Sequence, residues 1–397
     1  MSSKWGRNLL VTIYGRSHDE CIGVKIEGLP AGEIIDMVEL QEFLDRRSPG
    51  KDGVSQRKES DVPVILSGIR DGLTDGKMLE AVIYNEDVKS IDYVNLKYTP
   101  RPGHADYPAY IKFSGAEDMR GGGRFSGRLT APLCIAGGIA KQILSRRQIE
   151  IEASLSTDYL AEKDDSVGGI VSCRITGLPI GIGDALFDGI DGSIASAVFG
   201  IPAVKGIEFG AGFRSASMKG SENNDEYYLC DGEVCCKTNN AGGVLGGMTT
   251  GMPLIFNVAF KPTPSIAKEQ RTVNLKTMEE TVISISGRHD PCVAVRAVPV
   301  VEAVAALAIL DAMPCNDFSS LRNRIDIIDR NIACLLKSRF ELTDAIGDYK
   351  RAKGMSVTDA SREHEVLENV SSVAGKGLEK EVSEIYSEIF EMSKKRQ

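Results

Sequence analysis

Short β-rich runs separated by glycine-rich turns fill the first 310 residues of the chain. Such alternation between turns is typical of β-strands. The clearest predicted strands are 62–66, 81–84, 169–175 and 254–259. Two apolar stretches, 128–145 and 300–310, predict helices, and the weaker run 192–199 predicts a third. Helices that only interrupt a series of strands indicate an α+β domain, not a repeating βαβ unit.

From residue 320 onward the spacing of apolar residues becomes helical and glycine becomes rare. The apolar positions are Leu321, Ile325, Ile328, Ile332, Leu335, Leu336, Phe340 and Ile346. This pattern predicts one helix to about Lys350, a second from about Asp359 to Val373, and a third from Leu378 to the end. We therefore expect an all-α three-helix domain.

The residues between these two patterns read DAMPCNDFS, a proline and helix-capping residues after an apolar helix. We place a linker at 311–318, between a first domain over 1–310 and a second over 319–397. Three helices, one of them long, cannot easily bury their apolar faces within so short a domain. We expect the long helix to pair with a second chain.

Charge and composition exclude several classes of protein. A net charge of −9 argues against nucleic acid as a partner, because phosphate neutralisation needs clustered positive surface. The first 20 residues hold no long apolar run, so we expect neither a signal peptide nor membrane association, and a cytoplasmic protein. The nine cysteines are scattered without a CxxC pair, which predicts reduced thiols and no metal site.

Three of the four histidines lie in glycine-rich or proline-rich strings that also hold arginine and aspartate: GRSHDE (15–20), RPGHAD (101–106) and GRHDPC (287–292). Such strings place a proton donor beside a fixed positive charge on turn backbone, as a charged leaving group requires. Further strings are LDRRSPG (44–50), RGGGRFSGR (120–128), TNNAGGVLGG (238–247) and KPTPSI (261–266). Neither a GxGxxG after a strand nor a GxxxxGK[ST] occurs, which argues against a nicotinamide Rossmann site or a P-loop.

Each string has a simpler reading when it is taken alone. KPTPS is an ordinary turn, RHD is a common surface ion pair, and RGGGR occurs in nucleic-acid-binding segments. Their joint occurrence in one acidic chain favours a single functional site.

The seven strings, in this order and spacing, resemble the chorismate synthase family over residues 5–310. The resemblance implies a β-α-β sandwich core, a tetrameric assembly and a 1,4-elimination of phosphate from 5-enolpyruvylshikimate 3-phosphate. It also implies reduced flavin mononucleotide (FMN), which lends an electron and recovers it. Bidentate guanidinium groups suit the two carboxylates and the phosphate of this substrate.

By resemblance, His18 would protonate the leaving phosphate with help from Ser17, and His104 would protonate the flavin. Asp290 would act through the flavin's central nitrogen, and His289 would either orient Asp290 or react. The substrate-binding residues would be Arg46, Arg47, Arg101, Arg128 and Arg288. The cofactor-binding residues would be Arg124, Ser126, Arg128, Asn239, Gly242, Gly243, Lys261, Ser265 and Arg288.

The chain departs from the family pattern at two of these strings. Arg16 and Asp19 stand where the family usually has glutamate and glycine. The loop after Arg47 is one residue short and lacks a further arginine, with Lys51 and Arg57 as substitutes.

The tail strings LRNRIDIIDRNIACLLKSR (321–339), IGDYK (346–350) and VTDASRE (357–363) resemble the all-helical chorismate mutase family over 319–397. The resemblance implies rearrangement of chorismate to prephenate without acid, base or cofactor. Lys350 and Gln397 would donate hydrogen bonds to the breaking ether, and Arg322 and Arg339 would bind carboxylates. Glu363 would bind the ring hydroxyl, and the remaining family positions are Asp359, Arg362 and Ser393.

Helix geometry tests this assignment. Arg339 and Lys350 would lie about 16 Å apart on one face of a helix, within reach of one dicarboxylate. Arg322 would lie about 42 Å from Lys350 and needs a second, antiparallel copy of the helix to join them.

The first domain's product would be the second domain's substrate, so we predict a bifunctional shikimate-pathway enzyme acting on small molecules. Two alternatives stay open: a helical tail that is an inactive dimerisation or regulatory module, and a first domain with other flavin chemistry. The sequence does not decide whether a separate flavin reductase serves the enzyme.

Overall fold

The structure is a computed structural model. It describes residues 3–48, 61–85, 98–116, 120–156, 164–230, 232–285, 290–313, 318–356, 360–375 and 377–396, with the backbone alone at 120, 318–328, 330, 331 and 360. The chain divides into two compact units, Met1–Cys315 and Asn316–Gln397, each described here by itself.

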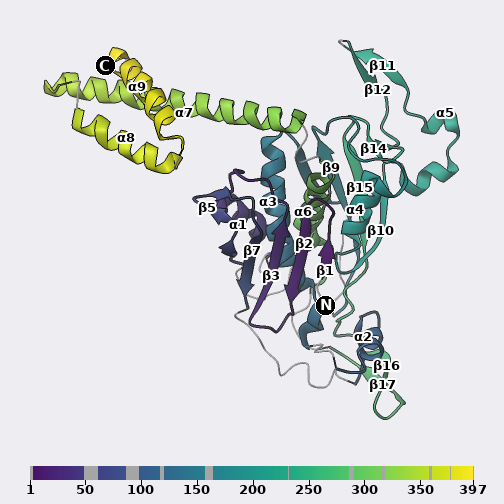
Figure 1. Cartoon of the computed structure of the whole chain (residues 1–397). Coiled ribbons are helices and arrows are strands. Elements are labelled where there is room, and N and C mark those ends of the chain that lie inside the picture. The colour runs from purple at the N-terminus through teal and green to yellow at the C-terminus, as the bar shows by residue number, and fades with distance from the viewer. Residues whose placement is uncertain are drawn as a thin grey trace. The chain divides into compact units, whose positions relative to one another are not determined.

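Two antiparallel sheets form the outer layers of the first unit (Figure 1). The five-stranded sheet has the order β1 (Ser3–Trp5), β2 (Leu10–Gly15), β3 (Cys21–Glu27), β7 (Leu79–Tyr84) and β4 (Val64–Ser67). The four-stranded sheet has the order β10 (Val204–Phe209), β15 (Leu254–Phe260), β9 (Gly169–Thr176) and β8 (Glu150–Leu155). The inner side chains of β9 and β15 alternate with exposed ones, as a sheet with one covered face requires.

Two buried helices, α3 (Thr130–Arg146) and α6 (Ala294–Ala312), lie between the sheets. Both are apolar almost all round, which is typical of a helix covered on every side. They approach closely at Gly137, where a Cβ atom would stand 2.2 Å from that of Ala303. The predicted β-α-β sandwich is confirmed.

The remaining elements of the first unit are shorter. The helices are α1 (Met37–Arg47), α2 (Asp106–Lys112), α4 (Ile190–Val198) and α5 (Gly220–Asn223). Two-stranded ribbons are β5 (Ile69–Arg70) with β6 (Leu73–Thr74), β11 (Tyr227–Cys230) with β12 (Glu233–Cys236), β13 (Val244–Leu245) with β14 (Met248–Thr249), and β16 (Gln270–Asn274) with β17 (Glu279–Ile283). Helix α1 was not predicted; the side chain of Asp36 caps it by accepting from the N–H groups of Val38 and Glu39.

The predicted linker is shorter than expected at both ends. Helix α6 continues to Ala312, because the Asp311 carboxylate accepts backbone N–H groups of Arg7, Asn8 and Leu9 at 2.7–2.9 Å. The next helix already begins at Phe318.

Three helices make up the second unit: α7 (Phe318–Lys353), α8 (Ala360–Ala374) and α9 (Glu379–Arg396). Each begins and ends within three residues of its prediction, so the all-α domain is confirmed. Helix α9 packs on both α7 and α8. A stripe of exposed apolar side chains stays along α7: Ile332, Leu335, Leu342, Ile346 and Tyr349. Among the described residues, no helix is long and apolar enough to cross a membrane.

Candidate active sites

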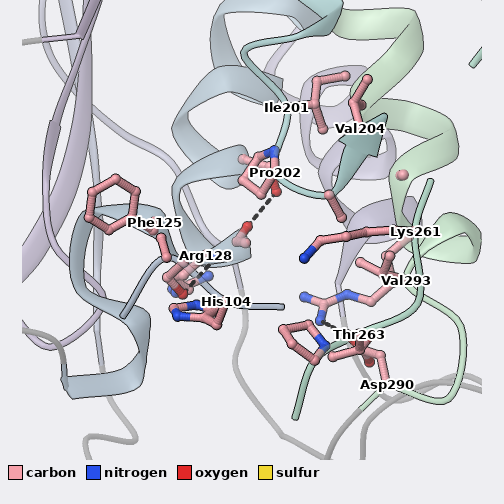
Figure 2. A pocket seen from close by; sticks show the side chains of 18 of the residues that line it. His104, Phe125, Arg128, Ile201, Pro202, Val204, Lys261, Thr263, Asp290 and Val293 are labelled. Carbon is pink, nitrogen blue, oxygen red and sulfur yellow. Dashed lines mark hydrogen bonds and ion pairs between the residues drawn. The ribbon is translucent and has the colours of Figure 1, made fainter. Parts of the chain in front are cut away.

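A cavity of about 680 Å³ opens in the first unit, between the N-terminal ends of α3 and α6 and the loop after β15. It collects the predicted residues Arg47, Arg101, His104, Arg124, Ser126, Arg128, Lys261, Ser265 and Asp290. Figure 2 shows His104 and Arg128 on one side of the cavity and Lys261, Thr263 and Asp290 across it. Segments almost 250 residues apart in the sequence thus meet at one place.

One buried carboxylate holds two of the arginines. Asp61 is fully buried and binds the guanidinium groups of both Arg47 and Arg128. Burial by itself would raise the pKa of Asp61, but the two arginines outweigh burial and hold the pKa below its ordinary value. The carboxylate therefore fixes both cations in the cavity wall.

A second carboxylate holds Arg101 and His104. Asp106, the first residue of α2, accepts from Arg101 Nε at 2.7 Å and Nη2 at 2.8 Å, and lies 2.7 Å from His104 Nδ1. Burial opposes ionisation of Asp106, yet Arg101 and His104 lower its pKa below the ordinary value. Since a carboxylate only accepts hydrogen bonds, the contact with Asp106 requires the proton on Nδ1, and Arg101 Nη2 lies 3.0 Å from the same nitrogen.

A loop of three glycines separates the two catalytic histidine candidates. Gly121, Gly122 and Gly123 all have positive φ values, which glycine adopts without strain. A Cβ atom on Gly121 would lie 2.6 Å from His18 Nε2, and one on Gly122 would lie 3.6 Å from His104 Nε2. Ser17 is tied to the same loop, because its N–H donates to the Gly123 carbonyl at 3.3 Å. The loop therefore places Ser17 and His18 against Gly121, which lines the cavity, although neither of the two is itself a lining residue.

The opposite wall carries two lysines and an ion pair. Lys261 donates to the carbonyl of Gly103, and burial lowers its pKa, with the neighbouring Lys205 lowering it further. Arg296 Nη1 lies 2.9 Å from Asp290 Oδ2. Lys205 and Arg296 both line the cavity, although the sequence analysis had singled out neither.

Arg46 does not reach this cavity. Its guanidinium makes two hydrogen bonds of 2.7 Å to Glu302, a buried residue of α6 that also binds Lys141. Successive residues of a helix point about 100° apart, so Arg46 and Arg47 face different surroundings. Arg46 instead lines a second cavity of about 610 Å³. The predicted substrate clamp thus loses one arginine.

Three residues predicted to bind the cofactor also lie elsewhere. Asn239, Gly242 and Gly243 form a turn in which Asn239 donates to the Pro253 carbonyl at 2.8 Å. The two glycines are required by packing, since a Cβ on Gly242 would stand 2.3 Å from the Gly210 nitrogen. The structure gives this turn a packing role.

Six candidates fall outside the described residues: Lys51, Arg57, Arg288, His289, Asp359 and Gln397. Arg322 lies on α7, with only its backbone described.

The second unit gathers part of the other predicted site. Arg339 donates to the Ser393 hydroxyl at 2.7 Å, and its guanidinium stands 5.6 Å from the Phe390 ring centre. Glu363 of α8 accepts from Lys394, the neighbour of Ser393, at 3.2 Å. Lys350 is half-buried on α7, and Arg362 pairs with Glu365 on the exposed face of α8. All three helices therefore contribute side chains near Arg339, Glu363 and Ser393.

The exposed stripe of α7 continues through this site. Leu335, Leu342 and Tyr349 recur every seven residues, as do Ile332, Arg339 and Ile346. A seven-residue repeat of this kind is typical of helices that pack against another helix.

Comparison with known proteins identifies the family of each unit. The family model for chorismate synthase matches residues 9–157 and 156–313, and that for chorismate mutase type II matches 321–397. A chorismate synthase of Korarchaeum cryptofilum is 43% identical over 346 residues, covering 77% of this chain and 96% of that protein. One of Chitinophaga pinensis is 47% identical over 322 residues, covering 78% and 96%.

A solved structure shows the same fold. A crystal structure of chorismate synthase superimposes with a TM-score of 0.60 at 26% identity, covering 77% of this chain and 92% of that one. The chain therefore belongs to the chorismate synthase family and carries a chorismate mutase type II domain behind it, which makes it a bifunctional shikimate-pathway enzyme, a lyase joined to an isomerase.

Proposed function

We propose that the 680 Å³ cavity is the place where 5-enolpyruvylshikimate 3-phosphate loses phosphate to give chorismate. In this elimination one C–O bond and one C–H bond break and a second ring double bond forms. The carrying observation is the concentration of cations in one hollow: Arg47, Arg101, Arg124, Arg128, Lys205 and Lys261, with Arg296 paired to Asp290 beside them. Guanidinium and ammonium groups suit a substrate with two carboxylates and a phosphate.

His18 and His104 are the proton donors of this proposal. His18 lies against Gly121, a lining residue of the cavity, and would deliver a proton to the departing phosphate, with Ser17 beside it. Asp106 holds His104 through Nδ1, so that Nε2 faces Gly122 and can exchange a proton there. Asp290, from the far wall, would serve as the proton acceptor of the reaction.

The residues present fit reduced FMN in the same cavity. The glycine loop leaves space beside Ser126 because Gly122 has no side chain; a Cβ there would lie 3.4 Å from that of Ser126. Lys261, Ser265 and Arg124 offer donors suited to a phosphate and to carbonyl oxygens. Bound there, reduced FMN would lend the substrate an electron and recover it. Arg288, outside the described residues, completes the proposed set.

The second unit would rearrange chorismate to prephenate. Arg339, beside Ser393, would bind a carboxylate, Glu363 the ring hydroxyl, and Lys350 and Gln397 the ether oxygen, with Asp359 and Arg362 in support. A cyclic rearrangement of this kind requires orientation more than acid or base, and fixed hydrogen-bond donors provide it.

Pairing of α7 with a second, antiparallel copy completes this site. Helix α7 runs without a break from Phe318 to Lys353, so the same chain's Arg322 lies about 42 Å from Lys350. The exposed stripe along α7 would be covered by the second copy. We propose an assembly of even number, a dimer or tetramer, in the cytoplasm, with reduced flavin supplied by the enzyme itself or by a separate reductase.

A coupled assay tests the proposal. With reduced FMN and 5-enolpyruvylshikimate 3-phosphate, the full chain releases phosphate and forms prephenate in equal amounts. His104→Ala slows phosphate release about 10²-fold while added chorismate is still converted to prephenate. Phosphate release without prephenate would instead show that the tail is an inactive or regulatory module.

A variant of α7 tests the pairing. Leu342→Glu places a charge in the exposed stripe and should lower prephenate formation at least tenfold, with recovery as enzyme concentration rises. Lys337→Glu, on the same helix but outside the stripe, should leave the mutase rate unchanged. Equal rates for both variants at all concentrations would reject the pairing.

A further inference from the structure

Arg296 is a cation of the cavity that touches both Asp290 and the end of α1. Its Nη1 donates to Asp290 Oδ2 at 2.9 Å, and its Nε donates to the carbonyl of Arg47 at 2.9 Å. Arg47 is the last residue of α1, where helical carbonyls point outward and carry partial negative charge. Two N–H groups of the same planar guanidinium are therefore bound by two different segments.

We infer that Arg296 is a positioning residue for Asp290 and holds that carboxylate at a fixed position relative to the arginines on the opposite side of the cavity. The inference depends on the proposed role of Asp290. A guanidinium is planar and directs its N–H groups at fixed angles, so two bonds fix the Asp290 carboxylate relative to α1. Asp61 binds both Arg47 and Arg128, so Arg128 is held in the same network of contacts.

Location supports a positioning role over direct reaction. Arg296 lies in the first turn of α6, which is packed between the sheets and includes the buried Glu302. Asp290 lies outside that helix, four residues before its first residue, and folds back onto the first turn. Burial lowers the pKa of Arg296, and the adjacent Arg47 lowers it further while Asp290 opposes this, but a guanidinium stays charged throughout the working pH range. Arg296 therefore has no proton to give and acts through the carboxylate it holds.

The test uses the full chain, reduced FMN and a phosphate-release assay. Arg296→Ala and Arg296→Gln should lower kcat about 10²-fold, the cost of a displacement near 1 Å at a reacting group. KM for the substrate should stay within about threefold, and FMN affinity should not change. Arg70→Gln, at an exposed arginine of β5, is the matched control and should have the parent rate.

Chemical rescue separates positioning from general stability. Millimolar guanidinium should restore at least tenfold of the lost kcat in Arg296→Ala, whereas urea, its neutral analogue, and sodium chloride should not. A loss of kcat that guanidinium does not restore would overturn the inference, as would a loss that falls on KM. Fluorescence of Trp5, the only tryptophan of the chain, reports whether each variant is folded.

A double-mutant cycle supplies the decisive comparison. If Arg296 works through Asp290, Arg296→Gln should cost nothing further in an Asp290→Asn background. Additive losses would overturn the inference. If Asp290→Asn is inactive but Arg296→Gln is fully active, the role of Arg296 is rejected and that of Asp290 stands. A fully active Asp290→Asn rejects the proposed role of Asp290, and the positioning role with it.

Discussion

Asp106 and His104 face each other across 2.7 Å, from carboxylate Oδ1 to imidazole Nδ1. The carboxylate is also bound by Arg101, so it cannot turn away from the ring. This pair fixes both the orientation of the imidazole and the nitrogen that points into the cavity. Two residues of one string, RPGHAD, therefore depend on each other for function.

Asp106→Asn should lower the rate of phosphate release about 10-fold to 100-fold, the range found for groups that orient a functional histidine. The amide replaces an acceptor by a group that also donates, which disturbs both His104 and Arg101. Glu226→Gln, which removes an exposed carboxylate partner of Lys237, is the control. Steady-state kinetics with reduced FMN provide the measurement, and equal rates for the two variants would contradict the prediction.

Gly121→Ala should lower the synthase rate at least tenfold. The new methyl group would stand 2.6 Å from His18 Nε2 and 2.8 Å from the Ser17 hydroxyl, at a φ of 59° that alanine adopts only with strain. Prephenate formation from added chorismate should not change.

Gly192→Ala is the matched control for that change. Gly192 lies in α4 with nothing within 4 Å of an added Cβ, so this substitution should leave the synthase rate unchanged. A Gly121→Ala enzyme as active as Gly192→Ala would mean that the glycine loop does not confine His18.

Asp61→Asn should destabilise the first unit by about 3–5 kcal/mol at pH 7, because two buried guanidinium groups lose their counter-charge. Arg47 and Arg128 hold the folded-state pKa of Asp61 below its unfolded value. The contribution of Asp61 is therefore fully present above a pH of about 4 and is lost as pH falls through the folded-state pKa. The gap between parent and variant should shrink in acid.

Urea unfolding followed by Trp5 fluorescence measures this gap at pH 7, 5 and 3.5, since Trp5 belongs to the first unit. Asp71→Asn, at an exposed carboxylate whose backbone conformation asparagine also tolerates, provides the control. Equal midpoints for the two variants at pH 7 would refute the role of Asp61.

Arg339→Ala should lower kcat/KM for chorismate at least 10²-fold and leave phosphate release by the synthase unchanged. Lys337→Ala lies two residues away, where its side chain is 79% exposed and 4.0 Å from Glu341. That variant should match the parent in both assays. Loss of mutase activity in both variants would point to damage of α7 in general, and retention in both would remove Arg339 from the site.

The sequence predicted the periodic elements best. All three tail helices and the buried α3 and α6 follow from apolar spacing over at least ten residues, which outweighs local ambiguity. Helix α1 also carried its signal, an Asp36 cap with apolar Leu40, Phe43 and Leu44. It is only 11 residues long, so its apolar positions repeat too few times to stand out.

The sequence predicted which residues belong to the site better than it predicted where their side chains point. The resemblance predicted that Arg47, Arg101 and Arg128 share one site, and all three line one cavity. No sequence pattern shows which way the adjacent arginines of α1 point, and Arg46 binds Glu302 instead. Asp61 had no sequence signal, because its partner Arg128 is 67 residues away. Asp106 did have one, since it follows His104 by two residues.

The contact of Asp311 with the backbone of Arg7, Asn8 and Leu9 has a consequence for biosynthesis. During translation the beginning of strand β2 leaves the ribosome about 300 residues before the carboxylate that secures it. The hairpin of β2 and β3 can form early, but residues 7–9 gain their partner only once the end of α6 has been made, when synthesis of the helices behind it is beginning.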